Sequence, residues 1–540
     1  MKKIILFVFI LFTLPVYSQI KFQRTYGTSA YDGAGGYPTP DGGYIMSGGI
    51  MAPPIIIQNF IMKADSLGKS IWTKTYESAD TSLKSNLGAI PSKDGGYLIS
   101  NYLFIGGNIG QPAHACLIKT DSNGDTIWVK RVDTGTNIYE NTDGTYSMMN
   151  GEHMLWKVDS GFNNILWAKN IDGFAQAQWM EKTKDGGYII YGDTKKYSSG
   201  GPVNNDFDLY VVKTDSAGVV QWSRAYGRSN TQEYISPNIN CIQQTNDRGY
   251  IFIGATDDGL PVPAVMDILV VKTDSLGNIQ WTKTYGGGQS GGGRGVSIRE
   301  VGGSIGYILI GLTRGVEAPQ NGNRTMLARL DGTGNIIWAK MYGSVSSNPW
   351  LQDEATLVEK AYDGGFVLSG STESMGAGNL DGWLVKTDAN GNSGCNEIST
   401  LPTISTPTLI VTIGGIDSSV APNQITNEGP LVIGAWQLPD SILCPLPSNP
   451  GVNEYELESL VSLFPNPTSG FFTINSEEIK IKNIEVYNVL GEQIQKLAIG
   501  SKQLATNSPT IDLSLSPDGI YFVRVDTEKG MVSKKVVVMR

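Results

Sequence analysis

The stretch "VVKTDSLGNIQWTKTYG", Val270 to Gly286, decides the fold because the chain repeats it. Close copies are "VVKTDSAGVVQWSRAYG" from Val211 and "LIKTDSNGDTIWVKRVD" from Leu117. In "TDSxG" the Gly adopts a positive φ without penalty and the Asp can accept hydrogen bonds from nearby backbone, so the segment favours a tight turn. Each copy therefore predicts two strands joined by a hairpin.

The repeat consists of a basic residue, Asp two positions later, Gly three after that and Trp four after the Gly. Seven copies begin at Lys63, Lys119, Lys157, Lys213, Lys272, Arg329 and Lys386, and the first six end at Trp72, Trp128, Trp167, Trp222, Trp281 and Trp338. A second motif, a Gly-rich turn before an aromatic residue and an apolar run, also occurs seven times, as in "DGGYIIYG" from Asp185. The strand "DILVVK" is apolar at successive positions, which predicts neighbouring sheets on both of its faces. Units of about four strands with this period predict a β-propeller.

The two ends of the repeat region predict how the ring closes. "KFQRTYG" from Lys21 matches the second half of a repeat, but no first half precedes it. The seventh copy has Cys395 at the Trp position and lacks a second half. Joining the halves would remove two exposed sheet edges. We therefore expect an all-β chain with a seven-bladed propeller over residues 20–394, in which the strand around Phe22–Tyr26 pairs with the strand around Leu384–Lys386.

The composition of the chain argues against several classes of function. The chain has 540 residues, a formal net charge of −10 and only two histidines, His114 and His153. An acidic chain without a basic cluster does not suit nucleic acid, which needs grouped Lys and Arg. Two histidines leave little room for a Ser-His-Asp triad or a multi-histidine metal site. We expect no cofactor.

The first residues predict export. Lys2 and Lys3 precede an apolar stretch and a small-residue site at Val16–Ser18, the pattern of a secretory signal peptide over residues 1–18. No later segment has the roughly 20 apolar residues that a spanning helix needs. An exported chain can form disulfides, and we expect Cys395 to pair with Cys444. Such a bridge would stabilise the fold by about 4 kcal/mol in the chain-entropy model.

Candidate ligand positions lie where the repeat varies. The position five residues before the basic residue is acidic in four copies, at Glu152, Asp208, Asp267 and Asp381. If this level faces the central channel, these acids suit a cation or a polar ligand; solvated strand ends are the alternative. A basic residue two positions after each Trp indicates either an anion-binding ring or scaffold contacts, and its regularity favours scaffold. The loops from Asp121 and Asp388 have calcium-like spacing but serve equally well as hairpin turns.

The "DxxGxxxW" pattern resembles the tryptophan-docking motifs of quinoprotein-type propellers. That resemblance implies the fold only. Quinone-dependent dehydrogenases of this kind usually have eight blades and an adjacent cysteine pair, and neither is found in this sequence. No cofactor follows from the resemblance.

The sequence changes character after the repeats. Residues 395–459 are rich in Ser, Thr and Pro, as in "STLPTISTPT", and we expect a connecting segment with strands packed beside the ring. Residues 460–540 contain short apolar runs split by Pro or Gly, which predicts a small β-sandwich.

That last segment closely resembles the C-terminal sorting domain of type IX secretion cargo. The landmarks that carry the resemblance are Pro465, Asn466, Pro467, Gly470, Gly491, Gly519, Tyr521, Lys534 and Lys535. The resemblance implies that the type IX secretion machinery is a partner and that the protein is secreted or held at the outer cell surface.

Two functions remain open for the propeller. The first is a binding or adhesion module for a glycan or protein ligand. The alternative is a polysaccharide hydrolase or lyase with a carboxylate pair. An enzyme of this kind should bring two acids from different blades to about 5–10 Å in one pocket.

Overall fold

A computed structural model describes the chain in two compact units, residues 1–446 and 447–540. The described residues are 19–28, 31–52, 56–77, 81–105, 114–132, 136–150, 153–200, 206–228, 231–235, 240–257, 266–286, 293–302, 306–313, 323–344, 351–419, 426–427, 432–436, 439–444, 461–476, 480–488, 493–498, 509–527 and 530–539. The predicted signal peptide, residues 1–18, lies outside them. Within the described part of the chain, no helix is long and apolar enough to cross a membrane.

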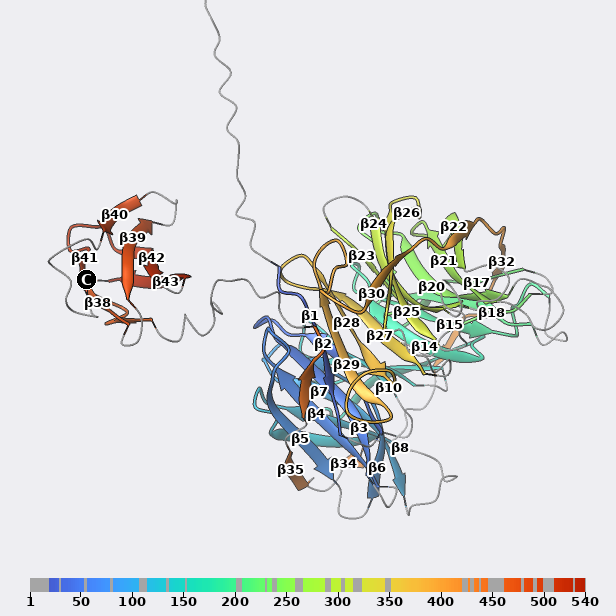
Figure 1. Cartoon of the computed structure of the whole chain (residues 1–540). Coiled ribbons are helices and arrows are strands. Elements are labelled where there is room, and N and C mark those ends of the chain that lie inside the picture. The colour runs from blue at the N-terminus through green and yellow to red at the C-terminus, as the bar shows by residue number, and fades with distance from the viewer. Residues whose placement is uncertain are drawn as a thin grey trace, which may run out of the picture. The chain divides into compact units, whose positions relative to one another are not determined.

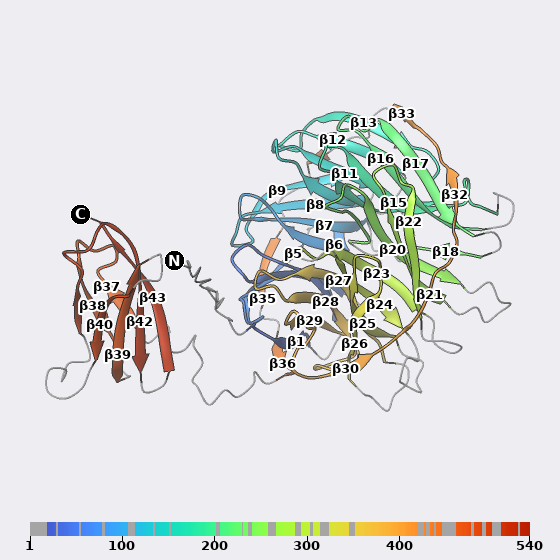
Figure 2. The same cartoon turned by 90° about the horizontal axis from the view of Figure 1, so that it is seen from above.

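The first unit is the predicted seven-bladed propeller, with sheets arranged radially around one axis (Figures 1 and 2). Blades 1 to 3 contain β2 (Tyr31–Pro38), β3 (Tyr44–Ala52), β4 (Ile56–Ala64) and β5 (Ser70–Glu77); β6 (Thr81–Pro91), β7 (Tyr97–Ile105), β8 (His114–Thr120) and β9 (Thr126–Val132); and β10 (Thr136–Glu140), β11 (Tyr146–Asn150), β12 (Met154–Val158) and β13 (Ile165–Ile171). Blades 4 and 5 contain β14 (Gln176–Lys182), β15 (Tyr188–Thr194), β16 (Asp208–Thr214) and β17 (Val220–Gly227), then β18 (Glu233–Tyr234), β19 (Ile242–Gln244), β20 (Tyr250–Asp257), β21 (Met266–Thr273) and β22 (Ile279–Gly286). Blade 6 contains β23 (Gly293–Glu300), β24 (Gly306–Thr313), β25 (Arg324–Asp331) and β26 (Ile336–Tyr342), and blade 7 contains β27 (Asp353–Lys360), β28 (Phe366–Thr372), β29 (Asp381–Thr387) and β1 (Phe22–Tyr26).

The ring closes as the sequence predicts. Strand β1 pairs antiparallel with β29, with Phe22 opposite Lys386 and Arg24 opposite Leu384. The N-terminal strand thus completes blade 7, whose other strands follow more than 300 residues later in the chain. Closure by strand pairing removes the two edges that an open ring would expose.

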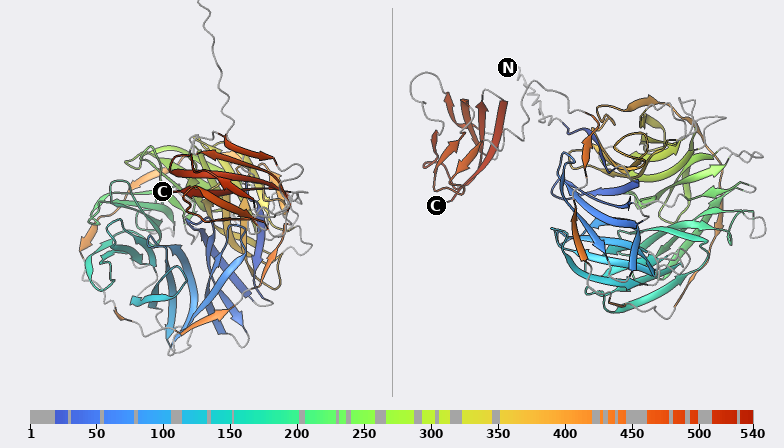
Figure 3. Two further views of the ribbon diagram at one scale, coloured as in Figure 1. Left: turned by 90° about the vertical axis from the view of Figure 1, so that its left-hand side faces the viewer. Right: turned by 60° about the horizontal axis from the view of Figure 1, so that its bottom comes forward.

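The segment that follows the repeats forms strands along the outer edges of the blades. It contributes a fifth, outermost strand to every blade, and we call its strands β30 to β36 the belt. They are β30 (Glu397–Thr400), β31 (Thr403–Ser405), β32 (Ile410–Ile413), β33 (Asp417–Ser419), β34 (Thr426–Asn427), β35 (Val432–Trp436) and β36 (Asp440–Ile442), paired in that order with β26, β22, β17, β13, β9, β5 and β1. The belt therefore runs around the rim from blade 6 back through blade 1 to blade 7 (Figures 2 and 3). Its Pro residues lie between these strands in the sequence, so none of them removes a hydrogen-bond donor from a strand.

The predicted disulfide is confirmed, since Cys395 and Cys444 are bonded. Cys395 lies just before the first belt strand and Cys444 just after the last. The other two cysteines, Cys116 and Cys241, are buried and are not disulfide-bonded.

The repeated residues hold neighbouring blades together. The Trp of each fourth strand contacts the aromatic residue that opens the second strand of the next blade, as in Trp281 with Tyr307 at 5.9 Å between ring centroids. The Tyr near the end of the same strand donates to the Gly carbonyl of the next blade's "TDSxG" turn, as in Tyr285 Oη to Gly334 O at 2.6 Å. Within a blade, the repeat Lys pairs with the Asp of the first turn, as in Lys272 with Asp247 at 2.7 Å. The motifs are therefore structural joints.

The second unit is a small sandwich of two sheets. One sheet contains β37 (Ser462–Phe464), β38 (Phe471–Asn475) and β41 (Thr510–Asp512). The other contains β40 (Gln493–Ala498), β39 (Ile481–Asn488), β42 (Gly519–Thr527) and β43 (Gly530–Val538). Both sheets contribute to one apolar core that includes Ile474, Val486 and Val523.

The landmark residues of the second unit support this sandwich. The Asn466 side chain donates to Lys535 O at 2.8 Å and accepts from Val537 N at 2.9 Å, which fastens the Pro465–Pro467 segment to the last strand. Tyr521 Oη donates to Pro517 O at 2.7 Å. Gly470 has a φ of 129°, and a Cβ there would lie 2.8 Å from Ser514 Cα. Gly491 lies outside the described residues.

Substituting Gly334 should show how much the blade joint contributes to stability. Gly334 has a φ of 81°, and a Cβ would lie 2.8 Å from the Trp281 ring. Gly42 has a φ of 84° but no atom within 4 Å of such a Cβ, so it is a matched control. Both Ala variants should lose about 1–2 kcal/mol to backbone strain, and Gly334→Ala about 1–3 kcal/mol more to overpacking. Equal losses in urea denaturation would show that the Trp contact contributes nothing.

Candidate functional site

The two faces of the ring carry different kinds of connection. One face carries the turns between first and second strands and between third and fourth strands, whose sequences repeat from blade to blade. Their polar groups are used in the joints between and within blades. The other face carries connections of unequal length, such as residues 195–207 between β15 and β16 and residues 373–380 between β28 and β29. Because its sequence varies, this loop face is where specific recognition can reside.

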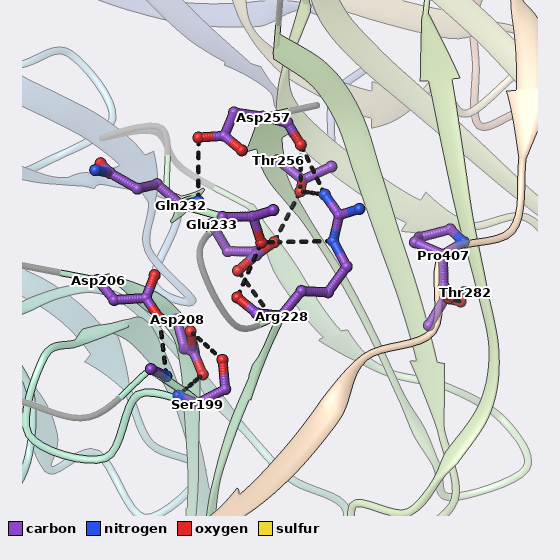
Figure 4. A network of polar contacts seen from close by, with 12 residues as sticks. Ser199, Asp206, Asp208, Arg228, Gln232, Glu233, Thr256, Asp257, Thr282 and Pro407 are labelled. Atoms are coloured by element: carbon purple, nitrogen blue, oxygen red, sulfur yellow. Dashed lines mark hydrogen bonds and ion pairs between the residues drawn. The ribbon is translucent and has the colours of Figure 1, made fainter. Parts of the chain in front are cut away.

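A network of charged residues lies on the loop face where blades 4 and 5 meet (Figure 4). Its centre is Glu233, whose side chain is fully buried and accepts hydrogen bonds from Thr231 at 3.0 Å and from Thr256 at 2.8 Å. Arg228 Nε lies 3.5 Å from Glu233 Oε1, and Arg228 Nη2 donates to Asp257 O at 2.6 Å. The network thus joins the end of blade 4 to the second strand of blade 5.

Two further acids lie beside this network. Ser199 N donates to Asp208 Oδ2 at 2.7 Å, and Gly200 N donates to Asp206 Oδ2 at 2.9 Å. Burial raises the pKa of Asp208 to about 7, and the neighbouring carboxylates of Glu233 and Asp206 add to that shift. Burial also raises the pKa of Asp206 and of Glu233. Near neutral pH the Asp208 carboxyl group can therefore both donate and accept hydrogen bonds.

Three of the four predicted channel-mouth acids lie among the described residues, each in a different blade. Asp208, Asp267 and Asp381 each begin or lie near the start of the third strand of their blade, so two strands separate them from the axis. Asp208 approaches Gly227 and Asp267 approaches Gly286, each on the fourth strand of its own blade. Asp381 accepts from Ala377 N at 2.8 Å and so holds the β28–β29 connection. Glu152 lies outside the described residues, and ligand contact at all four positions stays a prediction.

The loops from Asp121 and Asp388 make the hydrogen bonds of ordinary hairpin turns. Asp388 Oδ1 accepts from Asn390 N at 2.9 Å and from Asn392 N at 2.8 Å, and Asp121 Oδ1 accepts from Asn123 N and Asp125 N in the same way. Among the described residues, no group of three or more His, Cys, Asp or Glu could hold a metal ion.

The basic residue after each Trp serves as scaffold where its contacts are described. Lys74 pairs with Asp125 of the next blade at 2.5 Å and lies 5.8 Å from the centre of the Trp72 ring. Arg224 Nε donates to Leu276 O in the next blade at 2.9 Å. Lys169 pairs with Asp417 of the belt at 2.9 Å. These groups are used between blades or against the belt.

A second charged cluster lies on the first strands, which contact one another around the axis. Arg299 of blade 6 lies 2.7 Å from Glu181 of blade 4 and 3.0 Å from Glu359 of blade 7. Asn240 Nδ2 also donates to Glu359, at 2.6 Å. Burial raises the pKa of Glu181, although the Arg299 charge opposes that shift. The repeat motifs do not include these residues, because the residues come before the Gly-rich turn. Each lies on the first strand of its blade, opposite the apolar second strand, and this shared position is the signal that could have identified them.

The pKa of Asp208 predicts a pH-dependent stability. An unfolded Asp titrates near 3.9, so folding takes up a proton at Asp208 between about pH 4 and pH 7, and the free energy of unfolding falls as pH rises through this range. Asp208→Asn cannot ionise and should remove on the order of 2 kcal/mol of that fall. Urea denaturation at pH 4.5 and 7.5 tests this, with the exposed Asp125→Asn as control. An unchanged pH dependence in Asp208→Asn would contradict the prediction.

Three solved structures illustrate what the chain is similar to. They are BamB of Moraxella catarrhalis (12% identity, 65% of this chain and 95% of that one, TM-score 0.33), the type IX secretion component PorZ of Porphyromonas gingivalis (10%, 95% and 75%, 0.26) and an exo-β-1,3-galactanase of Phanerochaete chrysosporium with β-1,3-galactotriose (12%, 74% and 98%, 0.26). TM-scores and identities of this size support no inference about function. No curated protein matches the chain in sequence.

The second unit has a definite family match. Residues 462–539 match the family described as the secretion system C-terminal sorting domain. The match covers every strand of the sandwich, from β37 to β43. The chain is therefore a propeller protein that carries a C-terminal sorting domain of the type IX secretion system, and it is secreted across the outer membrane to the cell surface or the medium.

Proposed function

We propose that this protein is an exported binding module whose propeller holds a glycan or protein ligand on its loop face. The observation that carries the proposal is the network around the buried Glu233, whose residues lie outside the repeated sequence motifs. Glu233 itself is buried, but the partly exposed Arg228, Gln232 and Asp257 around it offer both hydrogen-bond donors and acceptors, which suits a ligand rich in hydroxyl or amide groups.

The use of the opposite face supports this assignment. Its turns are nearly identical in sequence, and their polar groups are engaged in blade joints. A surface that must keep the same contacts in each blade has little freedom to recognise one particular ligand. The loop face has that freedom because its connections differ in length and sequence.

The contacts at the axis favour binding over hydrolysis or lysis. Glu181 and Glu359 do come from different blades, as a carboxylate pair should. Both, however, bind the same buried Arg299 guanidinium. A general acid and a base must be free to exchange a proton with substrate, and here both carboxylates are paired with one arginine.

A binding assay with a matched pair of variants tests the proposal. The full chain without residues 1–18 is applied to a glycan array and to cell-surface protein extracts, beside Asp257→Asn and Asp125→Asn. Asp257 belongs to the loop-face network, whereas Asp125 is in a turn of the opposite face. We expect at least tenfold weaker binding for Asp257→Asn and unchanged binding for Asp125→Asn, since a good polar contact contributes about 1–3 kcal/mol. A ligand that loses affinity only with Asp125→Asn would place the site on the other face.

Deleting residues 460–540 should stop export without unfolding the propeller. The sandwich has its own core, and the propeller forms a separate compact unit. We expect the truncated protein to collect in the periplasm with its disulfide formed, and a foreign exported protein fused to residues 460–540 to reach the surface or medium. Cell fractionation with immunoblotting provides the measurement. Normal export of the truncated protein would refute a sorting role.

A further inference from the structure

The two ends of the belt meet at the place where the ring closes. In blade 7, strand β1 lies between β29 on one side and β36, the last belt strand, on the other. The disulfide joins Cys395, next to the first belt strand, to Cys444, next to β36. The blade that closes the ring therefore also closes the belt.

Gln23 in the middle of β1 connects these parts. Its buried side chain donates to Ser393 Oγ at 2.8 Å and to Cys395 O at 2.5 Å. Its backbone carbonyl accepts from Leu443 N at 2.8 Å. A single residue of the N-terminal strand thus contacts the chain immediately beside both cysteines. Arg24, the next residue, pairs with Asp440 of β36 at 2.6 Å.

The disulfide turns the belt into a covalent ring. Residues 395–444 and the disulfide form one closed loop, and this loop carries a strand of every blade. The connections between its first strands, which the structure describes, are short: Leu401 and Pro402 alone connect β30 with β31, and residues 414–416 alone connect β32 with β33. Side chains of the blades also donate hydrogen bonds to its backbone, from Thr282 Oγ1 to Pro407 O at 2.5 Å and from Ser223 Oγ to Gly415 O at 2.7 Å.

We infer that the belt and its disulfide form a redox-dependent lock on ring closure. Separating β1 from β29 widens the ring, and a closed loop already paired with each blade cannot widen. In the reduced protein β36 is held by its pairing with β1 and by the Arg24–Asp440 ion pair, so β1 and β36 can separate together from β29. Forming the Cys395–Cys444 disulfide removes two electrons and two protons from the two thiols. A disulfide-containing oxidant accepts them and becomes a dithiol. A dithiol reductant reverses the step, entering at Cys395, which is the less buried of the two.

Hydrogen exchange on the folded protein tests the lock. The oxidised protein is compared with protein reduced by dithiothreitol under native conditions and alkylated, and with Cys395→Ser/Cys444→Ser. We expect amide exchange in β1 and β36 to accelerate at least tenfold on reduction, while β15 and β16 on the far side of the ring stay unchanged. The double variant Cys116→Ala/Cys241→Ala, treated with the same reductant, controls for effects on the two cysteines outside the disulfide. Equal exchange at β1 in oxidised and reduced protein would overturn the proposal.

A cut in the belt separates a lock from a local cross-link. A protease site inserted between Ser419 and Thr426 allows the belt to be cleaved between β33 and β34 while the disulfide stays intact. If the closed loop locks the ring, cleavage should accelerate exchange in β1 and β36 as reduction does. If the disulfide acts only on its immediate surroundings, cleavage on the other side of the ring will leave β1 unchanged, and the proposal fails. Protein reduced in its folded state keeps the test valid even where the Cys395→Ser/Cys444→Ser variant does not fold.

Discussion

The propeller depends on the contact between the Trp of one blade and the "TDSxG" turn of the next. The Gly of that turn has a positive φ, and the Trp ring occupies the space where a Cβ would be, as at Gly218 under Trp167 and Gly391 under Trp338. One residue therefore satisfies two demands at once, the turn within its blade and the joint between blades. A Tyr four residues after the Trp, present in four of the six copies, adds a hydrogen bond to the same turn, as from Tyr226 to Gly277 at 2.7 Å. At the ring-closing joint Phe22 takes the place of the Trp, over Gly68.

Repetition made the ring predictable from sequence. The turn and Trp motifs recur with the blades, and the unmatched halves at Phe22 and Lys386 showed which strands pair. The belt was not predictable in this way, because its strands are two to five residues long, carry no motif and pair only with an existing edge. Their Thr, Ile and Val content is typical of strands, but the Pro residues between them made the segment resemble a linker.

The candidate site could be predicted only in part. Asp208 was found because its position in the repeat varies between blades. Arg228 follows β17 and Glu233 begins β18, both in stretches without a repeated sequence, and only folding brings them beside Asp208. Arg299 and its two acids lie on strands more than 50 residues apart in the chain. A single sequence shows the positions of such residues along a blade but not which blades face each other. The division of the ring into one face of joints and one face of variable connections is the more general result, since it follows from the strand order alone.

The direction of the belt has a consequence for how the chain folds. Blade 7 combines residues near 24, near 384 and near 441, so it cannot be completed until all three regions have left the inner membrane. Blades 1 to 6 can form their inner four strands in chain order, from local pairings that close quickly. Their outermost strands then arrive in the reverse order, blade 6 first and blade 1 sixth. The last-formed part of the first blade thus waits for nearly the whole propeller to be synthesised, and during that time its fourth strand is an open edge that a periplasmic chaperone would have to shield.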